Sequence, residues 1–220
     1  MKRITTIIAA LAALVCVGSC SSILDSIANV PYFQVRNLYD GQEFRIIRTS
    51  ACNYEWYGFD KDIVSLEIKG KETWMTVSLP LINNDRPIKT KISAKNPDNA
   101  QVEPQTVEFE VRPWKLSVLE AVGDSWREVT PVSLKVGKKY SVSMVCREYG
   151  KEEWTSVSAI NYTTLENTSL EWTIGNETPL QDIERHETYV TFTVKEPFAL
   201  MPIVGKLPKK NSEIVLTATK

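Results

Sequence analysis

Apolar and polar residues alternate with a period of two along most of the chain. Residues 74–79 and 189–194 show the pattern clearly, and so do 106–111 and 140–146. The alternation gives each segment one apolar face, which is typical of strands half-buried in a sheet. No amphipathic helical stretch of useful length follows residue 20. The pattern therefore predicts an all-β fold.

Segments of the first half recur in the second half. Residues 71–79 align with residues 186–194 at an offset of 115, which continues without a gap through Lys95-Asn96 over Lys210-Asn211. Two shorter matches lie upstream at other offsets, Glu55-Trp56 over Glu171-Trp172 at 116 and Gly41-x-x-Phe44-x-Ile46 over Gly137-x-x-Tyr140-x-Val142 at 96. Such recurrence indicates a duplication.

The duplication predicts two tandem β-sandwich domains, over residues 27–113 and 114–220. The junction is expected at Arg112-Pro113-Trp114, where no glycine- or serine-rich linker occurs. A junction this short predicts a semi-rigid rod.

The first twenty-two residues, MKRITTIIAALAALVCVGSCSS, have the layout of an export signal. Lys2 and Arg3 precede the apolar stretch Ile4–Val17, and Val17-Gly18-Ser19-Cys20 resembles the lipobox of bacterial lipoproteins. The resemblance implies a signal peptide over residues 1–19 and an acylated Cys20. It also implies a lipidated tether over 20–26 and a cell-envelope location, lipid-anchored in the outer membrane. An ordinary signal peptide and an uncleaved anchor are the alternatives, although a span needs about 20 apolar residues.

Two further resemblances extend this interpretation. Residues 131–142, followed by Leu170-Glu-Trp-Thr-Ile174, resemble the bacterial immunoglobulin-like domains of surface proteins. The combination of lipobox and tandem sandwich resembles secreted lipoproteins of the Bacteroidetes. Asp25-Ser26-Ile27 matches the O-glycosylation tripeptide of that group, which makes Ser26 a candidate for modification. The expected fold is thus two tandem immunoglobulin-like β-sandwich domains after a lipoprotein signal peptide.

The net charge and the cysteine content limit the kinds of partner and the disulfides expected for this chain. A net charge of −1 gives no electrostatic case for nucleic acid. No second apolar span occurs, so the acyl chains are the expected membrane contact. Each expected domain has one cysteine, Cys52 and Cys146, which rules out a bridge within a domain. The two either form a disulfide between domains or are separate buried thiols.

The sequence offers little for catalysis. His186 is the single histidine, and common nucleophile, phosphate-binding and zinc motifs are absent. No cofactor or metal is therefore expected, and an enzyme is the least favoured of three interpretations.

Aromatic residues are the best candidates for ligand binding. The segment 53–59 holds four of them, of which Trp56 matches Trp172 and is expected in the core, whereas Tyr57 and Phe59 are expected to be exposed. Residues 147–168 form an insertion relative to the first half and contain Tyr149 and Trp154. This insertion is either a binding loop or an extra hairpin that covers the sandwich.

The sequence thus predicts a non-enzymatic envelope lipoprotein that binds a glycan or a protein. The alternative is a structural spacer or a fimbria-like accessory subunit. Arg36, after the strand-like segment 30–35, would be the maturation site in that case.

Overall fold

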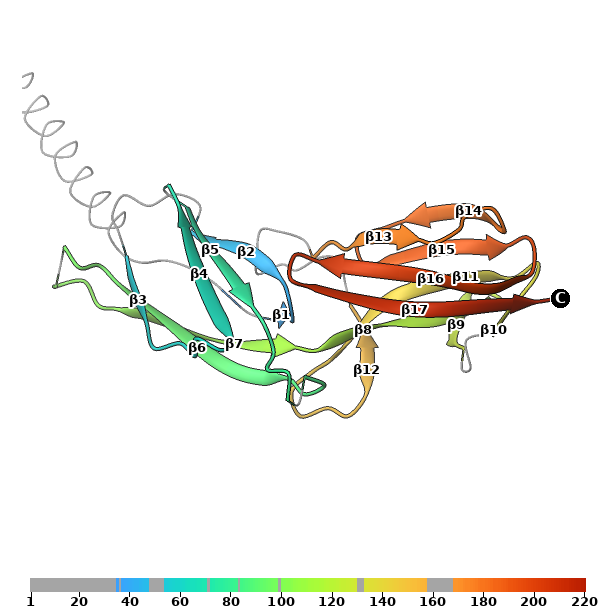
Figure 1. The fold of residues 1–220 in the computed structure, drawn as a ribbon. Helices are drawn as coiled ribbons and strands as arrows, with labels where there is room; N and C mark the ends of the chain where they lie inside the picture. Colours follow the sequence, from blue (N-terminus) through green and yellow to red (C-terminus); the bar gives the residue numbers. More distant parts are fainter. Residues whose placement is uncertain are drawn as a thin grey trace, which may run out of the picture.

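The computed structural model describes residues 35, 37–47, 54–70, 72–82, 84–98, 100–129, 133–157 and 168–220. None of these residues is helical, and no membrane-spanning helix is found among them. Two β-sandwiches follow one another along the chain (Figure 1). The strands are β1 (Leu38–Tyr39), β2 (Glu43–Ile47), β3 (Glu55–Tyr57), β4 (Val64–Lys69), β5 (Glu72–Val77), β6 (Ile88–Lys95), β7 (Gln105–Arg112), β8 (Trp114–Val122), β9 (Ser125–Glu128), β10 (Ser133–Lys135), β11 (Lys139–Arg147), β12 (Trp154–Ser156), β13 (Glu171–Ile174), β14 (Leu180–Arg185), β15 (Tyr189–Val194), β16 (Phe198–Leu207) and β17 (Lys210–Thr219).

The same strand order is used twice. In the first sandwich (β1–β7), one sheet has the order β1-β7-β6-β3 and the other β2-β5-β4. In the second sandwich (β8–β17), one sheet has the order β10-β17-β16-β13 and the other β14-β15-β11-β8-β9, with β12 paired to β11. Strands β1 and β10 are the parallel partners of β7 and β17; the other pairings are antiparallel.

This order is that of an immunoglobulin-like sandwich. Strands β8, β11, β15 and β14 take the places of strands A, B, E and D, and β13, β16 and β17 take those of C, F and G. In the first sandwich, β2, β5 and β4 correspond to B, E and D, and β3, β6 and β7 to C, F and G. The predicted fold class, all-β with two tandem immunoglobulin-like sandwiches, is confirmed.

The strand registers correct the repeat alignment. The backbone N–H of Gly41 donates to the carbonyl of Val77 on β5, and that of Gly137 donates to Val194 on β15. Strands β5 and β15 therefore correspond at an offset of 117 rather than 115. Trp56 lies opposite Ala94 and Trp172 opposite Gly205, so β6 and β16 correspond at 111. The two offsets are wrong by two and four residues. Because side chains alternate with a period of two along a strand, an even error leaves the predicted inward faces correct. The offsets of 116 and 96 are confirmed.

Each sandwich has its own hydrophobic core, filled by the inward residues of both sheets. Phe44, Met75 and Ile92 are fully buried in the first core, and Tyr140, Phe192 and Leu216 in the second. Trp56 and Trp172 each pack against the core of their own sandwich, as predicted.

One residue, Pro113, separates β7 from β8, and a polar cluster locks the sandwiches together beside it. Asp40 is the centre of this cluster. One of its carboxylate oxygens accepts from the backbone of Leu79 at 2.8 Å and the other pairs with Lys210 Nζ at 2.5 Å. Its carbonyl accepts from Trp114 Nε1 at 2.7 Å. A charge this well buried must be compensated in place, so these contacts oppose rotation at the junction.

Candidate functional site

An open depression of about 690 Å³ crosses the outward face of the first sandwich's C-F-G sheet. Its lining comes from all four strands or their ends, with Lys89 and Lys91 on β6, Glu108 and Glu110 on β7, Asn37 beside β1, and Gly58 and Asp60 after β3. Lys89 lies opposite Glu110, and Lys91 opposite Glu108. Thr90 and Phe109 also line the depression, so its floor combines apolar surface with charged side chains of nearly balanced sign, which can offer both donors and acceptors to a ligand.

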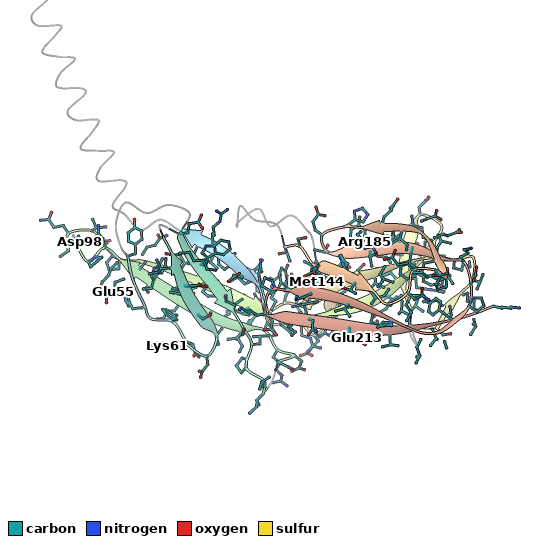
Figure 2. All side chains as sticks on the ribbon, turned by 45° about the horizontal axis from the view of Figure 1, so that its top comes forward. Glu55, Lys61, Asp98, Met144, Arg185 and Glu213 are labelled. Carbon is teal, nitrogen blue, oxygen red and sulfur yellow. The ribbon has the colours of Figure 1, made fainter. Side chains whose placement is uncertain are left out.

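Tyr57 lies at one end of this face. It stands opposite Ser93 on β6 and is 39% exposed. Lys95 Nζ lies 5.7 Å from its ring centroid and pairs with Glu55 at 3.0 Å. Glu55 is on the side of the first sandwich that points away from the second one (Figure 2). The expected exposure of Tyr57 is confirmed.

Tyr149 lies at the opposite end, although it belongs to the second sandwich. It follows β11 in the hairpin that leads to β12, and it is 53% exposed. Lys89 Nζ lies 4.4 Å from its ring centroid, and its backbone N–H donates to Glu110 at 2.6 Å. Two tyrosines that are 92 positions apart in the sequence therefore border one face.

Trp154 and Phe59 differ from their expected roles as free aromatic faces. Trp154 is half-buried, and Lys115 Nζ and the Arg147 guanidinium lie 4.4 Å and 4.8 Å from its ring, so it is less accessible to a ligand than Tyr149, which is 53% exposed. Phe59 is half-buried and packs against the first core, two residues beyond the end of β3. The expectation that Phe59 is exposed is wrong.

The insertion is a hairpin where the structure describes it. Strand β12 pairs with Val145–Arg147 at the end of β11, and Val157 is buried against the second core. The prediction of an extra hairpin is confirmed for residues 147–157. Arg147 donates to the backbone carbonyl of Asp85 at 3.3 Å, which ties this hairpin to the first sandwich.

Charges behind the hairpin strengthen this attachment. Arg112, with a side chain 11% exposed, pairs with Glu110 and Glu148, both at 3.1 Å. Burial lowers the pKa of Arg112, but the two carboxylates outweigh it and leave the pKa above its ordinary value. A hydrogen bond from Lys151 lowers the pKa of Glu148. Arg112 and Glu148 therefore remain charged at neutral pH, and their ion pair helps to hold Tyr149 in place.

Cys146 is a free, buried thiol on β11, and burial raises its pKa. This agrees with the alternative of unpaired cysteines. Within the described ranges, no cluster of three or more histidine, cysteine or acidic residues is placed to hold a metal. His186 stacks on Tyr189, with ring centroids 4.2 Å apart, and takes a packing role.

Sequence reasoning missed the charged floor. Its signal was present as Lys89-Thr-Lys91 and Glu108-Phe-Glu110, two alternating runs of opposite charge. Several predicted sites, Cys20, Ser26, Arg36 and Cys52, lie outside the described residues.

No protein-family model matches the chain, and no curated protein matches it. Among solved structures, it is similar to titin tandem immunoglobulin domains with 11% identity and a TM-score of 0.25, covering 84% of this chain and 93% of that one. Tandem immunoglobulin repeats of Dlar share 8% identity with a TM-score of 0.26, over 86% and 96%. FdeC, an Escherichia coli adhesin, shares 7% with a TM-score of 0.31, over 84% and 62%.

TM-scores this low leave the strand order as the basis of the immunoglobulin-like assignment. The fold and the face together define a class, a tandem immunoglobulin-like protein with a charge-lined depression bordered by tyrosines.

Proposed function

We propose that this chain is a non-enzymatic lipoprotein of the cell envelope that binds a glycan or a protein through the outward C-F-G face of its first sandwich. Acyl groups on Cys20 anchor it in the outer membrane, and Ser26 in the tether carries an O-glycan. The membrane contact is the lipid alone, with no cofactor and no nucleic acid partner.

One observation carries the binding proposal, the depression between Tyr57 and Tyr149. Exposed tyrosines stack on sugar rings or anchor protein partners at low cost in side-chain entropy. The floor between them supplies lysine donors and glutamate acceptors. Binding sites combine aromatic surface with a few oriented polar groups, as this face does.

The Tyr149 hairpin also gives the tandem a role in binding. The face is complete only while the two sandwiches keep their relative position, because Tyr149 comes from the second and Lys89 from the first. The Asp40 cluster and the Arg112 pairs maintain that position.

A glycan and host-protein array probed with residues 21–220 tests the proposal. Both cores lie within residues 35–218, so this soluble chain retains them. Tyr57→Ala and Tyr149→Ala should each weaken a bound partner by about tenfold or more. Tyr189→Ala is the matched control. Tyr189 is 37% exposed, much like Tyr57, but it lies on β15, in the β14-β15-β11-β8-β9 sheet of the second sandwich. Binding that both variants retain in full would refute the site.

The anchor has its own test. The full chain should incorporate a palmitate analogue and fractionate with outer membranes, whereas Cys20→Ser should do neither. Unchanged labelling of Cys20→Ser would refute lipidation at this residue.

A structural spacer is the second candidate, and the locked junction favours it. A one-residue linker braced by Asp40 and Lys210 suits a part that sets a fixed distance. A clean negative in the array, with a partner found by crosslinking in the envelope, would support this alternative.

A further inference from the structure

The outward C-F-G faces of the two sandwiches carry opposite chemistry at equivalent positions. The registers set by the two tryptophans place Lys91 of β6 over Pro202 of β16. On the neighbouring strands, Glu108 takes the place of Val215. The charged face of the first sandwich is therefore replaced by an apolar one in the second.

The apolar face consists of Leu200, Pro202, Val204 and Val215, contributed by adjacent strands β16 and β17. Leu200 is 73% exposed and Val215 45% exposed, Pro202 is exposed and Val204 is half-buried. Pro202 lies directly opposite Val215, so their side chains adjoin, and Leu200 lies in the irregular stretch of β16 between Phe198 and Met201. A contiguous exposed apolar patch marks an interaction surface more often than scattered apolar residues do.

The sandwich itself does not require this patch. The inward residues of the same strands, Met201, Ile203 and Leu216, are fully buried and supply the core. The first sandwich keeps the same sheet with lysine and glutamate at the outward positions. The apolar residues at the outward positions of β16 and β17 are therefore not needed for folding, which indicates a role in contact with another molecule.

The charges around the patch suit a second copy of the same face. The outward charged residues of this sheet are two lysines and two glutamates, Lys135, Lys206, Glu171 and Glu213. Lys206 and Glu171 already pair at 3.7 Å. A face without net charge can meet its own copy without the like-charge repulsion that excludes many self-contacts.

The size of the face sets the strength of the contact. Strands β16 and β17 are ten residues long, whereas β10 has three residues and β13 has four. With strands about 4.8 Å apart and about 3.4 Å per residue, the face covers about 440 Å². Two such faces would bury roughly 900 Å² in total, which is the size of a weak, transient contact. A dimer of this kind forms at high local concentration, as on a crowded surface, and dissociates on dilution.

We propose that the outward face of the β10-β17-β16-β13 sheet is a self-association surface, through which two copies pair about a two-fold axis. Sheets pack face to face with their strands nearly aligned, and Leu200 and Val215 of each copy would bury against those of the other. This surface is separate from the Tyr57–Tyr149 face, so the proposal stands without the proposed function.

Sedimentation velocity of residues 21–220 between about 5 and 500 μM tests the proposal. The weight-average mass should rise from one chain towards two. The variant Leu200→Lys/Val215→Glu, which introduces charges like those of Lys89 and Glu108, should stay monomeric, with dimerisation at least tenfold weaker. Leu81→Lys/Ile82→Glu is the control, because it removes two residues that are 93% and 81% exposed elsewhere and should dimerise normally.

Three results would overturn the proposal. The unmodified chain stays monomeric at 500 μM, the face variant dimerises as well as the unmodified chain, or the control loses dimerisation equally. A crosslinked foreign protein lost only in the face variant, with a monomeric unmodified chain, would assign the face to that protein instead. Near-UV circular dichroism checks folding, and Val215→Glu alone replaces the double variant if that variant unfolds.

Discussion

Gly41 offers a direct measurement of how firmly the junction is held. It lies in the turn before β2 with φ +81°, and a Cβ there would lie 2.3 Å from Lys210 Cβ and 2.7 Å from Lys210 N. Gly137 is its repeat counterpart, with φ +82°, and a Cβ there would meet nothing within 4 Å. The two glycines share a backbone conformation and differ in their surroundings, so each is the control for the other.

The expected costs follow from these two facts. Left-handed backbone costs an alanine about 1–2 kcal/mol, which both substitutions incur. Gly41→Ala also forces apart two packed segments, one of them backbone, which adds about 1–3 kcal/mol. Gly137→Ala should therefore cost about 1–2 kcal/mol and Gly41→Ala about 2–5 kcal/mol. The difference between the two costs measures how strongly the junction holds the sandwiches together, because the sandwiches can relieve the clash at Gly41 by separating.

Urea unfolding followed by tryptophan fluorescence gives both free energies. Small-angle X-ray scattering then checks whether Gly41→Ala lengthens or loosens the particle while Gly137→Ala leaves it unchanged. Equal costs, with identical scattering, would refute the view that Gly41 is needed for close approach of the two sandwiches.

Three further predictions concern Tyr39, Cys146 and Trp154. Burial raises the pKa of Tyr39 from 10.0 to about 12. The neutral phenol therefore favours the folded state by up to about 3 kcal/mol below pH 10, and this stabilisation is lost as the pH rises to 12. Tyr39→Phe should flatten that alkaline decline in urea titrations, and an unchanged slope would contradict the assignment. Cys146→Ser should cost about 1 kcal/mol, and the native thiol should react slowly with a disulfide reagent at pH 8, because burial raises its pKa. Rapid labelling without denaturant would contradict its burial. Trp154→Ala removes contacts with Lys115 and Arg147 and should lower the free energy of unfolding by about 2 kcal/mol. The effect should be measured as faster amide hydrogen exchange in β11 and β12. Unchanged exchange would mean that other contacts hold the hairpin.

Alternation and repetition were enough to predict the strands and the duplication, since both depend on local pattern. The offset of 115 failed because it matched residue identities, such as Glu72-Thr73 over Glu187-Thr188, whereas the correspondence of strands is set by turns and registers. The alternating segments 106–111 and 140–146 lie within β7 and β11.

Contacts between the sandwiches could not be predicted from either repeat. Asp40 and Lys210 are 170 positions apart, and no periodicity links them. The binding face has the same origin, since Tyr149 reaches it only through the position of the second sandwich on the first. Phe59 was misassigned because the period-two rule ends where β3 ends, at Tyr57.

The parallel pairings give this chain a mechanical property. In the first sandwich, β1 is the first described strand and β7 the last, and they are parallel neighbours. In the second sandwich, β10 and β17 are also parallel neighbours, but β8 and β9 precede β10. A pull on the two ends of the chain draws such neighbours in opposite directions along their length. Their hydrogen bonds are then loaded together in shear instead of being opened one after another. Two residue pairs hold β1 to β7 in this position, so we expect the first sandwich to yield at a low force.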